Sequence, residues 1–387
     1  MLSPHSFRLF PNPNAGTPGV VVLPDRGFLR ARDEITSWPG YAETALHDLA
    51  AIAAEAGVAA VRLKDESTRF GLGSFKALGG AYAVAQALGV ELARRSVAPQ
   101  VTSADLVAGT YLDSTRDITV TCATDGNHGR SVAWGAQRFG CRCVIYVHST
   151  VSQGRVDAIA RYGAEVRRVP GTYDDAVRQA ARDAEANRWF VISDTSYEGY
   201  TTVPVDVMQG YRLMAEEALA QWQGPPPTHC FMQGGVGGAA AAVSVQLRST
   251  ISPRPVFVVA EPDQAACLLA SAEAGQPVAI PGDLDTLMAG LACGEPSLLA
   301  WQELSRAADV FMAVPDEAAV DCMRLLARQG IVAGESGVAG LAAMLLAAAD
   351  PAARATLSLG PDSRVLLFST EGATDPELYA RLVADAA

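Results

Sequence analysis

One lysine in this sequence has neighbours that favour a reactive amine over a solvated surface charge. In the stretch GLGSFKALGG, Lys76 is surrounded by small and apolar residues. Only Lys64 and Lys76 of the 30 basic residues are lysine, and the others are arginine. Because a guanidinium stays protonated and is no amine nucleophile, an arginine-rich chain retains lysine where an amine is needed. An amine in an apolar pocket loses its proton more readily and can form a Schiff base. The alternative is a solvated lysine on the first helical turn.

A glycine-rich turn offers a place for an anion. The segment HCFMQGGVGGAAAAVSVQL predicts a strand, a tight turn and a helix. Backbone N–H groups of such a turn, at a helix N-terminus, form a cradle for a phosphate. The turn is no Walker loop and fits GxGxxG poorly, so an ordinary strand-to-helix turn is the alternative. Together with Lys76, the turn predicts pyridoxal 5′-phosphate, the aldehyde cofactor that a lysine amine holds. The predicted phosphate residues are Gly234, Gly235, Val236, Gly237 and Gly238.

A third motif, TCATDGNHGRSVAWGAQRFG, again predicts a strand, a polar turn and a helix. Asn127 can hydrogen-bond a ring hydroxyl, and the N–H groups from Thr124 to Gly129 can receive a carboxylate at the helix start. Alternatively, Asp125 and Asn127 simply cap the helix. Asp194 ends the predicted strand WFVISD, at the carboxyl edge of a sheet where ligand sites gather. A cap on the following turn is the alternative for Asp194.

The order of these motifs resembles that of the fold type II pyridoxal phosphate enzymes, which include the serine and threonine dehydratases and the tryptophan synthase β chain. The motifs are SFK, GNHG, GGVGG and FSTEG. Within this family, KDESTRFGLGSFKALGG, ATDGNHGR, DTSYEGYTTVP, LMAGLACGEPS and STEGATD are most similar to the diaminopropionate ammonia-lyases. The resemblance spans residues 60 to 375.

This resemblance implies roles for individual residues. Lys76 matches the Schiff-base lysine, Asn127 the asparagine beside the ring oxygen, and the five-residue glycine turn the phosphate loop. Ser369 matches the hydroxyl residue at the pyridine nitrogen, with Thr370 as the alternative because the register of STEG is open by one residue. Thr124 and His128, from the GNHG region, are predicted to bind substrate.

The resemblance also implies the reaction, a pyridoxal-phosphate-dependent α,β-elimination of 2,3-diaminopropionate to pyruvate and ammonia. The place before GNH is usually small and uncharged in ordinary dehydratases, whereas here it is Asp125. In the family, the lysine takes the Cα proton of the L-isomer and this aspartate that of the D-isomer. We expect both isomers to be substrates, with Asp194 binding the β-ammonium group. Lys76, Asp125 and Asp194 are thus the predicted catalytic residues.

Short apolar runs alternate with helical patterns from about residue 60 onward. Nearly continuous apolar strands separated by helices predict parallel sheets covered on both faces. We therefore expect an α/β fold of two domains, each with a mainly parallel twisted sheet flanked by helices. Residues 1–90 and 223–387 form the predicted large domain, and residues 91–222 the predicted small domain. The predicted strands are 60–66, 118–124, 141–148, 164–170, 189–194, 228–233, 256–262, 310–315 and 364–370.

Composition restricts the partners. A net charge of −12 argues against nucleic acid and anionic membranes, and no apolar run is long enough for a membrane span. The scattered histidines and cysteines predict no metal site. We expect a cytoplasmic enzyme, and a homodimer by analogy with the family. Two alternatives stay open: another β-eliminating lyase such as a serine or threonine dehydratase, and a non-catalytic protein that has kept the cofactor pocket.

Overall fold

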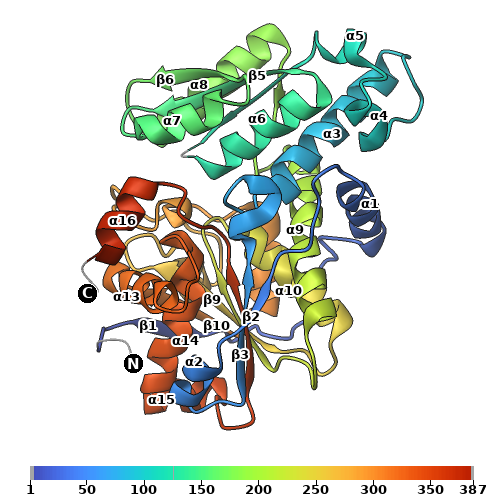
Figure 1. Ribbon diagram of the computed structural model, residues 1–387. Coiled ribbons are helices and arrows are strands. Elements are labelled where there is room, and N and C mark those ends of the chain that lie inside the picture. The colour runs from blue at the N-terminus through green and yellow to red at the C-terminus, as the bar shows by residue number, and fades with distance from the viewer. Residues whose placement is uncertain (1–3, 125, 385–387) are drawn as a thin grey trace. The chain divides into compact units, whose positions relative to one another are not determined.

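The structure, a computed structural model, describes residues 4–124 and 126–384. Its contacts divide the chain into two compact units (Figure 1). Unit 1 comprises Met1–Val22, Glu43–Thr68 and Met214–Ala387. Unit 2 comprises Leu23–Ala42 and Arg69–Leu213. Both units alternate strands with helices, which confirms the predicted α/β fold.

The two units do not coincide with the predicted domains. Residues 69–90, expected in the large domain, belong to unit 2 because α3 (Ala77–Arg94) packs along α6 (Asn127–Phe139). Residues 23–42, which include α1 (Asp25–Thr36), also belong to unit 2. The second boundary falls within the long helix α9 (Thr202–Gln221), after Leu213, and not at the proline-rich segment that follows the helix.

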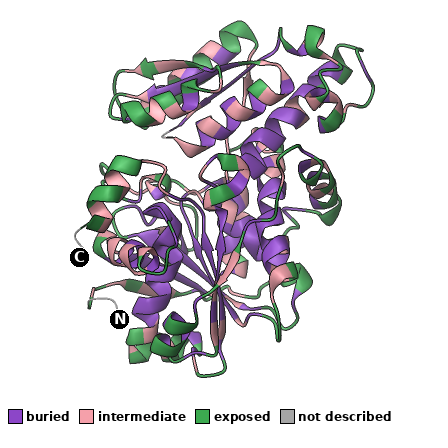
Figure 2. Ribbon diagram, viewed as in Figure 1, coloured by how far each residue is buried: buried purple, intermediate pink, exposed green. Residues whose placement is uncertain are grey.

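Unit 1 contains a seven-stranded sheet in the order β1-β10-β9-β8-β11-β3-β2. All neighbours in its interior are parallel, and only the edge strands β1 and β2 pair antiparallel, with β10 and β3 respectively. The interior strands are almost entirely buried, as Figure 2 shows, which explains their continuous apolar sequences. The strands are β1 (Arg8–Pro11), β2 (Leu46–Asp48), β3 (Ala60–Asp65), β8 (His229–Gln233), β9 (Val256–Pro262), β10 (Val310–Val314) and β11 (Arg364–Ser369).

Helices cover this sheet and complete the core of unit 1. The central one is α14 (Ala339–Ala349), with the sequence AGLAAMLLAAA, which packs on β8, β9 and β10. A helix that is apolar on every side is buried on every side, and this one is. The other helices of unit 1 are α2 (Ala50–Ala56), α10 (Gly238–Thr250), α11 (Cys267–Ala274), η2 (Ala289–Leu291), α12 (Leu298–Ala307), α13 (Asp316–Ala327), η3 (Ser336–Val338), α15 (Pro351–Leu357) and α16 (Pro376–Ala384), where η denotes a 3-10 helix.

Unit 2 contains a four-stranded parallel sheet in the order β6-β5-β4-β7. Helices α6 and α8 both pack on β4 and β5. The strands are β4 (Thr119–Ala123), β5 (Arg142–His148), β6 (Glu165–Val169) and β7 (Phe190–Val191). The remaining helices are α4 (Ser103–Val107), α5 (Leu112–Thr115), α7 (Gln153–Ala160) and α8 (Tyr173–Asn187), and the 3-10 helix η1 (Glu66–Gly71) precedes α3 across the unit boundary.

Glycines let two helices approach α3 closely. A Cβ atom at Gly135 of α6 would lie 2.8 Å from Cα of Ala81, and one at Gly210 of α9 would lie 1.8 Å from the carbonyl oxygen of Leu78. No side chain larger than hydrogen fits at such distances. The first turns of α3, which directly follow Lys76, are therefore held between α6 and α9.

Within residues 4–124 and 126–384, no single helix is long and apolar enough to cross a membrane. One pair, Ser336–Ala349 and Pro351–Leu357, meets the criteria of length and composition only when both helices are taken together, and the two are bent by 111° at their junction.

Candidate active site

Lys76 directly precedes α3 and faces an acidic group. Its Nζ atom lies 2.7 Å from Oδ2 of Asp194. The same ammonium lies 5.1 Å from the ring centre of Phe75 and 5.6 Å from that of Tyr211. The predicted apolar surroundings of the lysine are thus aromatic, and a carboxylate accompanies them. About a fifth of the lysine side chain is exposed, so it is accessible as well as held.

Asp194 follows β7, which pairs with β4 in unit 2. The backbone of Ile192 extends this pairing, since its N–H donates to the carbonyl oxygen of Thr121. Burial disfavours the charge of Asp194, but the ammonium of Lys76 outweighs this effect and holds the pKa of the carboxyl well below its usual range. Asp194 is therefore a carboxylate at neutral pH, held at the carboxyl edge of the sheet as predicted.

His128 reaches the same carboxylate from α6. Its Nδ1 atom lies 3.7 Å from Oδ2 of Asp194, and its Nε2 atom lies 2.7 Å from the carbonyl oxygen of Ile192. Burial lowers the pKa of this imidazole despite the nearby carboxylate, so the ring is neutral at pH 7. The structure thus brings Lys76, His128 and Asp194 together within unit 2.

The start of α6 differs in part from the prediction. Oγ1 of Thr124 accepts hydrogen bonds from the N–H groups of Gly126 and Gly129, both at 3.0 Å, while the N–H of Thr124 donates to Tyr146. These three N–H groups are used within the fold, which corrects their prediction as carboxylate donors. Thr124 instead shapes the turn through its hydroxyl group. Asp125, the predicted second base, lies outside the described residues.

Asn127, the predicted partner of the ring oxygen, is the first residue of α6 and only partly buried. Its Oδ1 atom accepts a hydrogen bond from Nη2 of Arg130 at 2.7 Å. Since a carbonyl oxygen is used in this bond, the amide NH₂ is the end that can serve as donor to an oxygen of a ligand. Arg130 thereby orients the asparagine, a contact of neighbouring helical turns that the sequence did not reveal.

The predicted phosphate turn lies in unit 1 between β8 and α10. Gly235 and Gly237 have φ angles of 63° and 93°, which favour glycine over any other residue. A Cβ atom at Gly234 would lie 2.7 Å from Cγ of Glu261. The turn leads into a helix of 13 residues, whose first N–H groups have no partner within the helix. This arrangement suits a phosphate dianion.

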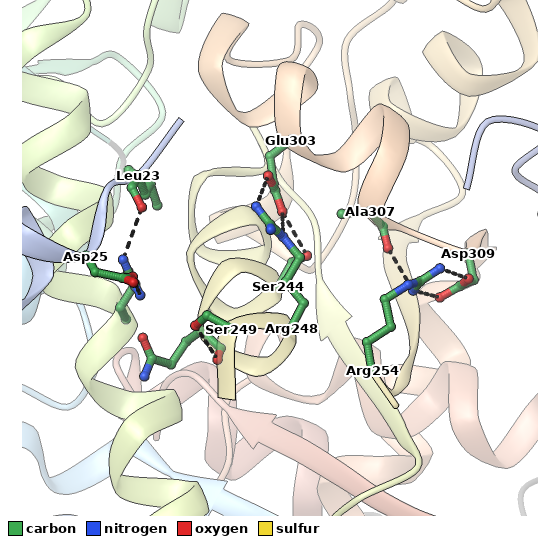
Figure 3. Close-up of polar contacts among 11 residues, drawn as sticks. Leu23, Asp25, Ser244, Arg248, Ser249, Arg254, Glu303, Ala307 and Asp309 are labelled. Carbon is green, nitrogen blue, oxygen red and sulfur yellow. Dashed lines mark hydrogen bonds and ion pairs between the residues drawn. The ribbon is translucent and has the colours of Figure 1, made fainter. Parts of the chain in front are cut away.

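Polar contacts fix the helix that follows this turn, as Figure 3 shows. Arg248 near the end of α10 donates to both carboxylate oxygens of Glu303 in α12, at 2.8 and 2.9 Å. Ser244, one turn earlier, donates to the same carboxylate at 3.2 Å. Because a bidentate guanidinium–carboxylate pair fixes both distance and direction, α12 holds α10 and thereby the glycine turn at its start.

Ser369 and Thr370 lie at the carboxyl end of β11, the strand next to β8. Both are buried, and the ends of these neighbouring parallel strands bring them to the same edge as the glycine turn. Oγ of Ser369 donates to the carbonyl oxygen of Glu371 over a long 3.3 Å, whereas Oγ1 of Thr370 accepts from Nε2 of Gln233 at 3.0 Å. Each hydroxyl thus has a local partner within unit 1.

Sequence reasoning missed Gln233, the last residue of β8. Its Nε2 atom also donates to the carbonyl oxygens of Gly337 and Phe368, both at 2.8 Å. This amide joins the strand before the glycine turn to the strand that carries Ser369. The only available signal was a polar residue that ends an otherwise apolar strand. Tyr211 was missed too, although its contact with the ammonium of Lys76 follows from the close approach of α9 to α3.

The second lysine has a different environment. Lys64 is completely buried in unit 1, where its Nζ atom lies 2.7 Å from Oε2 of Glu217. It also donates to the carbonyl oxygen of Thr44 at 2.7 Å and to Oε1 of Gln221 at 3.2 Å. A compact ammonium with three donors matches three acceptors around one point, which the planar fork of arginine does not.

A family model described as pyridoxal-phosphate dependent enzyme matches residues 37–371. The chain belongs to this family. It is also 40% identical over 355 residues to the diaminopropionate ammonia-lyase of Escherichia coli (strain K12), across 89% of this chain and 88% of that protein. The crystal structure of the holo diaminopropionate ammonia lyase from Escherichia coli matches with a TM-score of 0.91 at 36% identity, covering 100% of this chain and 98% of the other. The structure of that enzyme in complex with D-serine matches with a TM-score of 0.90 at 35% identity, again covering 100% and 98%.

These similarities confirm the predicted family, its fold type II architecture and its cofactor. As a pyridoxal-phosphate-dependent enzyme, the protein needs an amine for the aldehyde and an anion cradle for the phosphate. Lys76 carries an amine of this kind, and the turn with left-handed Gly235 and Gly237 at the start of α10 has the form of such a cradle. The residues present therefore fit pyridoxal 5′-phosphate.

Proposed function

We propose that this enzyme eliminates ammonia from 2,3-diaminopropionate, from both its D- and L-isomers, and yields pyruvate and ammonia. The observation that carries the proposal is the carboxylate of Asp194, held ionised 2.7 Å from an alkylammonium group, in a chain 40% identical to a diaminopropionate ammonia-lyase. A partly buried carboxylate suits a substrate with a second amine. The D-serine complex of the Escherichia coli enzyme supports the acceptance of D-amino acids.

The cofactor residues follow from the same proposal. Lys76 would hold the aldehyde carbon of pyridoxal 5′-phosphate, Asn127 would bind the ring oxygen, and the turn from Gly234 to Gly238 would bind the phosphate. Ser369, with Thr370 as the alternative, would be the hydroxyl residue at the pyridine nitrogen. When bound, the cofactor withdraws electrons from the Cα of the substrate and so makes the Cα–H acidic.

The side chains of this protein then accept the Cα proton and bind the β-ammonium group. Nζ of Lys76 leaves Asp194, gives its extra proton to solvent and, as a neutral amine, accepts the Cα proton of the L-isomer. Asp125 accepts that of the D-isomer from the opposite face. Oδ2 of Asp194 binds the β-ammonium group and keeps it protonated, because ammonia leaves readily only from its protonated form. A positioned base contributes about two to four powers of ten in rate. The unsaturated amino acid that remains hydrolyses to pyruvate and a second ammonia.

The proposal also covers location, oligomeric state and partners. We propose a cytoplasmic homodimer that takes part in amino-acid catabolism and binds neither nucleic acid nor membranes. The net charge of −12 supports the absence of such polyanionic partners. Light scattering coupled to size exclusion tests the dimer, and a mass that stays at one chain across micromolar concentrations would contradict it.

An amino-acid panel tests the reaction. The purified holoenzyme is expected to release pyruvate from D- and L-2,3-diaminopropionate faster than from serine, threonine or O-acetylserine. Faster release from serine or threonine would favour a dehydratase. A protein that binds the cofactor and releases no keto acid from any member of the panel would favour a non-catalytic binding protein.

A further inference from the structure

His128 has one ring nitrogen engaged and one without a hydrogen-bond partner among the described residues. The side chain is buried, with 8% of the residue exposed. Nε2 lies 2.7 Å from the carbonyl oxygen of Ile192, whereas Nδ1 makes no hydrogen bond to any residue that the structure describes. A buried polar atom in this situation is costly and indicates a missing partner.

The hydrogen bond of Nε2 determines whether Nδ1 is protonated. A carbonyl oxygen only accepts hydrogen bonds, so Nε2 carries the proton and donates it to Ile192. In a neutral imidazole the second nitrogen is then an acceptor. Burial lowers the pKa of His128 and keeps the ring in this neutral form. Nδ1 therefore presents a lone pair and needs a donor.

A second acceptor faces the same place. Nδ1 lies 3.7 Å from Oδ2 of Asp194, and two acceptors at this distance repel each other unless a donor lies between or beside them. One donor to Asp194 among the described residues is the ammonium of Lys76, at 2.7 Å. This group is a primary alkylammonium, the same chemical group as the β-ammonium of 2,3-diaminopropionate.

Gly80 of α3 lies beside the same nitrogen. A Cβ atom at Gly80 of α3 would lie 3.6 Å from Nδ1 and 2.0 Å from Oγ of Ser131, whose hydroxyl already donates to the carbonyl oxygen of His128. The glycine therefore leaves Nδ1 uncovered while the neighbouring hydroxyl is used elsewhere. A donor placed beside both Nδ1 of His128 and Oδ2 of Asp194 can bond to both acceptors.

We propose that Nδ1 of His128 and Oδ2 of Asp194 together accept N–H donors of the β-ammonium group, and that His128 thereby selects an amine over a hydroxyl at the β-carbon of the substrate. The selection follows from donor number: an ammonium has three protons and can satisfy both acceptors, whereas a hydroxyl has one and leaves an acceptor buried without a partner. This inference rests on the proposed function and assigns the substrate specificity of the same site.

Two variants separate this role from packing. His128→Asn places an acceptor oxygen near the position of Nδ1 and gives up the contact with Ile192, whereas His128→Gln reaches towards Ile192 and gives up the acceptor at Nδ1. We expect the ratio of kcat/KM for 2,3-diaminopropionate to that for serine to fall about tenfold in His128→Gln and to stay near the wild-type ratio in His128→Asn. Equal losses for both substrates in both variants would show a purely structural role and overturn the proposal.

Nitrogen NMR of the full-length protein with ¹⁵N-labelled histidine gives a readout that does not depend on turnover. At neutral pH, the His128 signals, assigned by their loss in His128→Asn, are expected to show a protonated Nε2 and an unprotonated Nδ1. Addition of 2,3-diaminopropionate is expected to shift Nδ1, whereas serine shifts it less. A protonated Nδ1, or equal shifts with both ligands, would overturn the inference. If the wild type binds the diamine in this way and releases no pyruvate, the proposed function fails and the amine site stands.

Discussion

Oδ2 of Asp194 lies 2.7 Å from Nζ of Lys76, although 118 positions separate the two residues in the sequence. Lys76 reaches this point from the start of α3, and Asp194 from the turn after β7. The ion pair keeps the lysine protonated. Its partner, Oδ2 of Asp194, is the acceptor that we propose for the β-ammonium group of the substrate. Substrate ammonium and lysine ammonium thus compete for one carboxylate, and the displaced lysine becomes the base once it has given its extra proton to solvent.

The attachment of the cofactor is predicted at one of only two lysines. Reduction of the holoenzyme with borohydride, followed by digestion and mass spectrometry, is expected to find the pyridoxyl group on Lys76 and none on Lys64. Lys64 is the internal control, because its ammonium is completely buried and bound to Glu217. Modification of Lys64, or of neither lysine, would remove Lys76 from its role.

Replacing Asp194 with asparagine keeps the shape of the side chain and removes its charge. Since a hydrogen bond to a charged group contributes about 1.5–3 kcal/mol, kcat/KM for 2,3-diaminopropionate is expected to fall roughly ten- to hundredfold. The loss with serine should be smaller, because serine has no β-ammonium.

The matched control for this change is Glu198→Gln, which removes a carboxylate from an exposed position of the same loop. We expect near wild-type kinetics from it. If Asp194→Asn affects both substrates equally, or behaves like the control, Asp194 does not bind the β-amine.

The buried pair of Lys64 and Glu217 is predicted to stabilise unit 1 only as a pair. Lys64→Met leaves a buried carboxylate without its ammonium and is expected to cost about 3–5 kcal/mol in urea denaturation. The double variant Lys64→Met, Glu217→Met removes both charges and should recover most of that loss. A double variant as unstable as the single one would show that packing around these side chains, and not their charge, sets the stability.

Glu261 makes the stability of unit 1 depend on pH. Its carboxyl is completely buried under the glycine turn, and burial raises its pKa from 4.5 to about 8, against the opposing N–H donors of Leu268 and Leu269. A folded pKa above the unfolded one means that the stabilisation is complete below about pH 4.5 and is lost as the pH rises through about 8. In Glu261→Gln the group no longer titrates, so its free energy of unfolding should fall less steeply between these pH values.

The exposed Glu273 lies on α11, the helix that carries Leu268 and Leu269, and gives the control for this slope. Glu273→Gln should keep the wild-type pH dependence of unfolding. A wild type and a Glu261→Gln variant with parallel pH profiles would show that Glu261 is ionised in the folded protein throughout this range.

The interior strands of the fold could be predicted because each has a recognisable local sequence pattern. All nine predicted strands are present. Most are buried on both faces and read as continuous apolar runs, whereas β6 and β7 are only partly buried or exposed. The edge strands β1 and β2 were missed. They have four and three residues, and their pairing depends on the exposed edges of β10 and β3 and not on their own sequences.

The site divides in the same way. Lys76 and the glycine turn could be found from residue type and spacing, because an amine and an anion cradle need those residues. The role of Gln233 could not, since it depends on a carbonyl group 135 positions away. For His128 the resemblance predicted substrate binding, but the proton on Nε2 depends on a carbonyl group 64 positions away and could not be predicted. The unit boundary near Lys76 was missed for the same reason. It depends on the close packing of α3 against α6 and α9, at Gly135 and Gly210, which are distant in the sequence.

The ratio of ammonia to pyruvate released from 2,3-diaminopropionate tests the central claim most directly. Elimination followed by hydrolysis releases both nitrogen atoms, so the wild-type holoenzyme is expected to release about two ammonia molecules per pyruvate with either isomer, and Lys76→Ala none. Serine, with one nitrogen atom, serves as the one-to-one standard. No pyruvate from the diamine, or undiminished release by Lys76→Ala, would contradict the account.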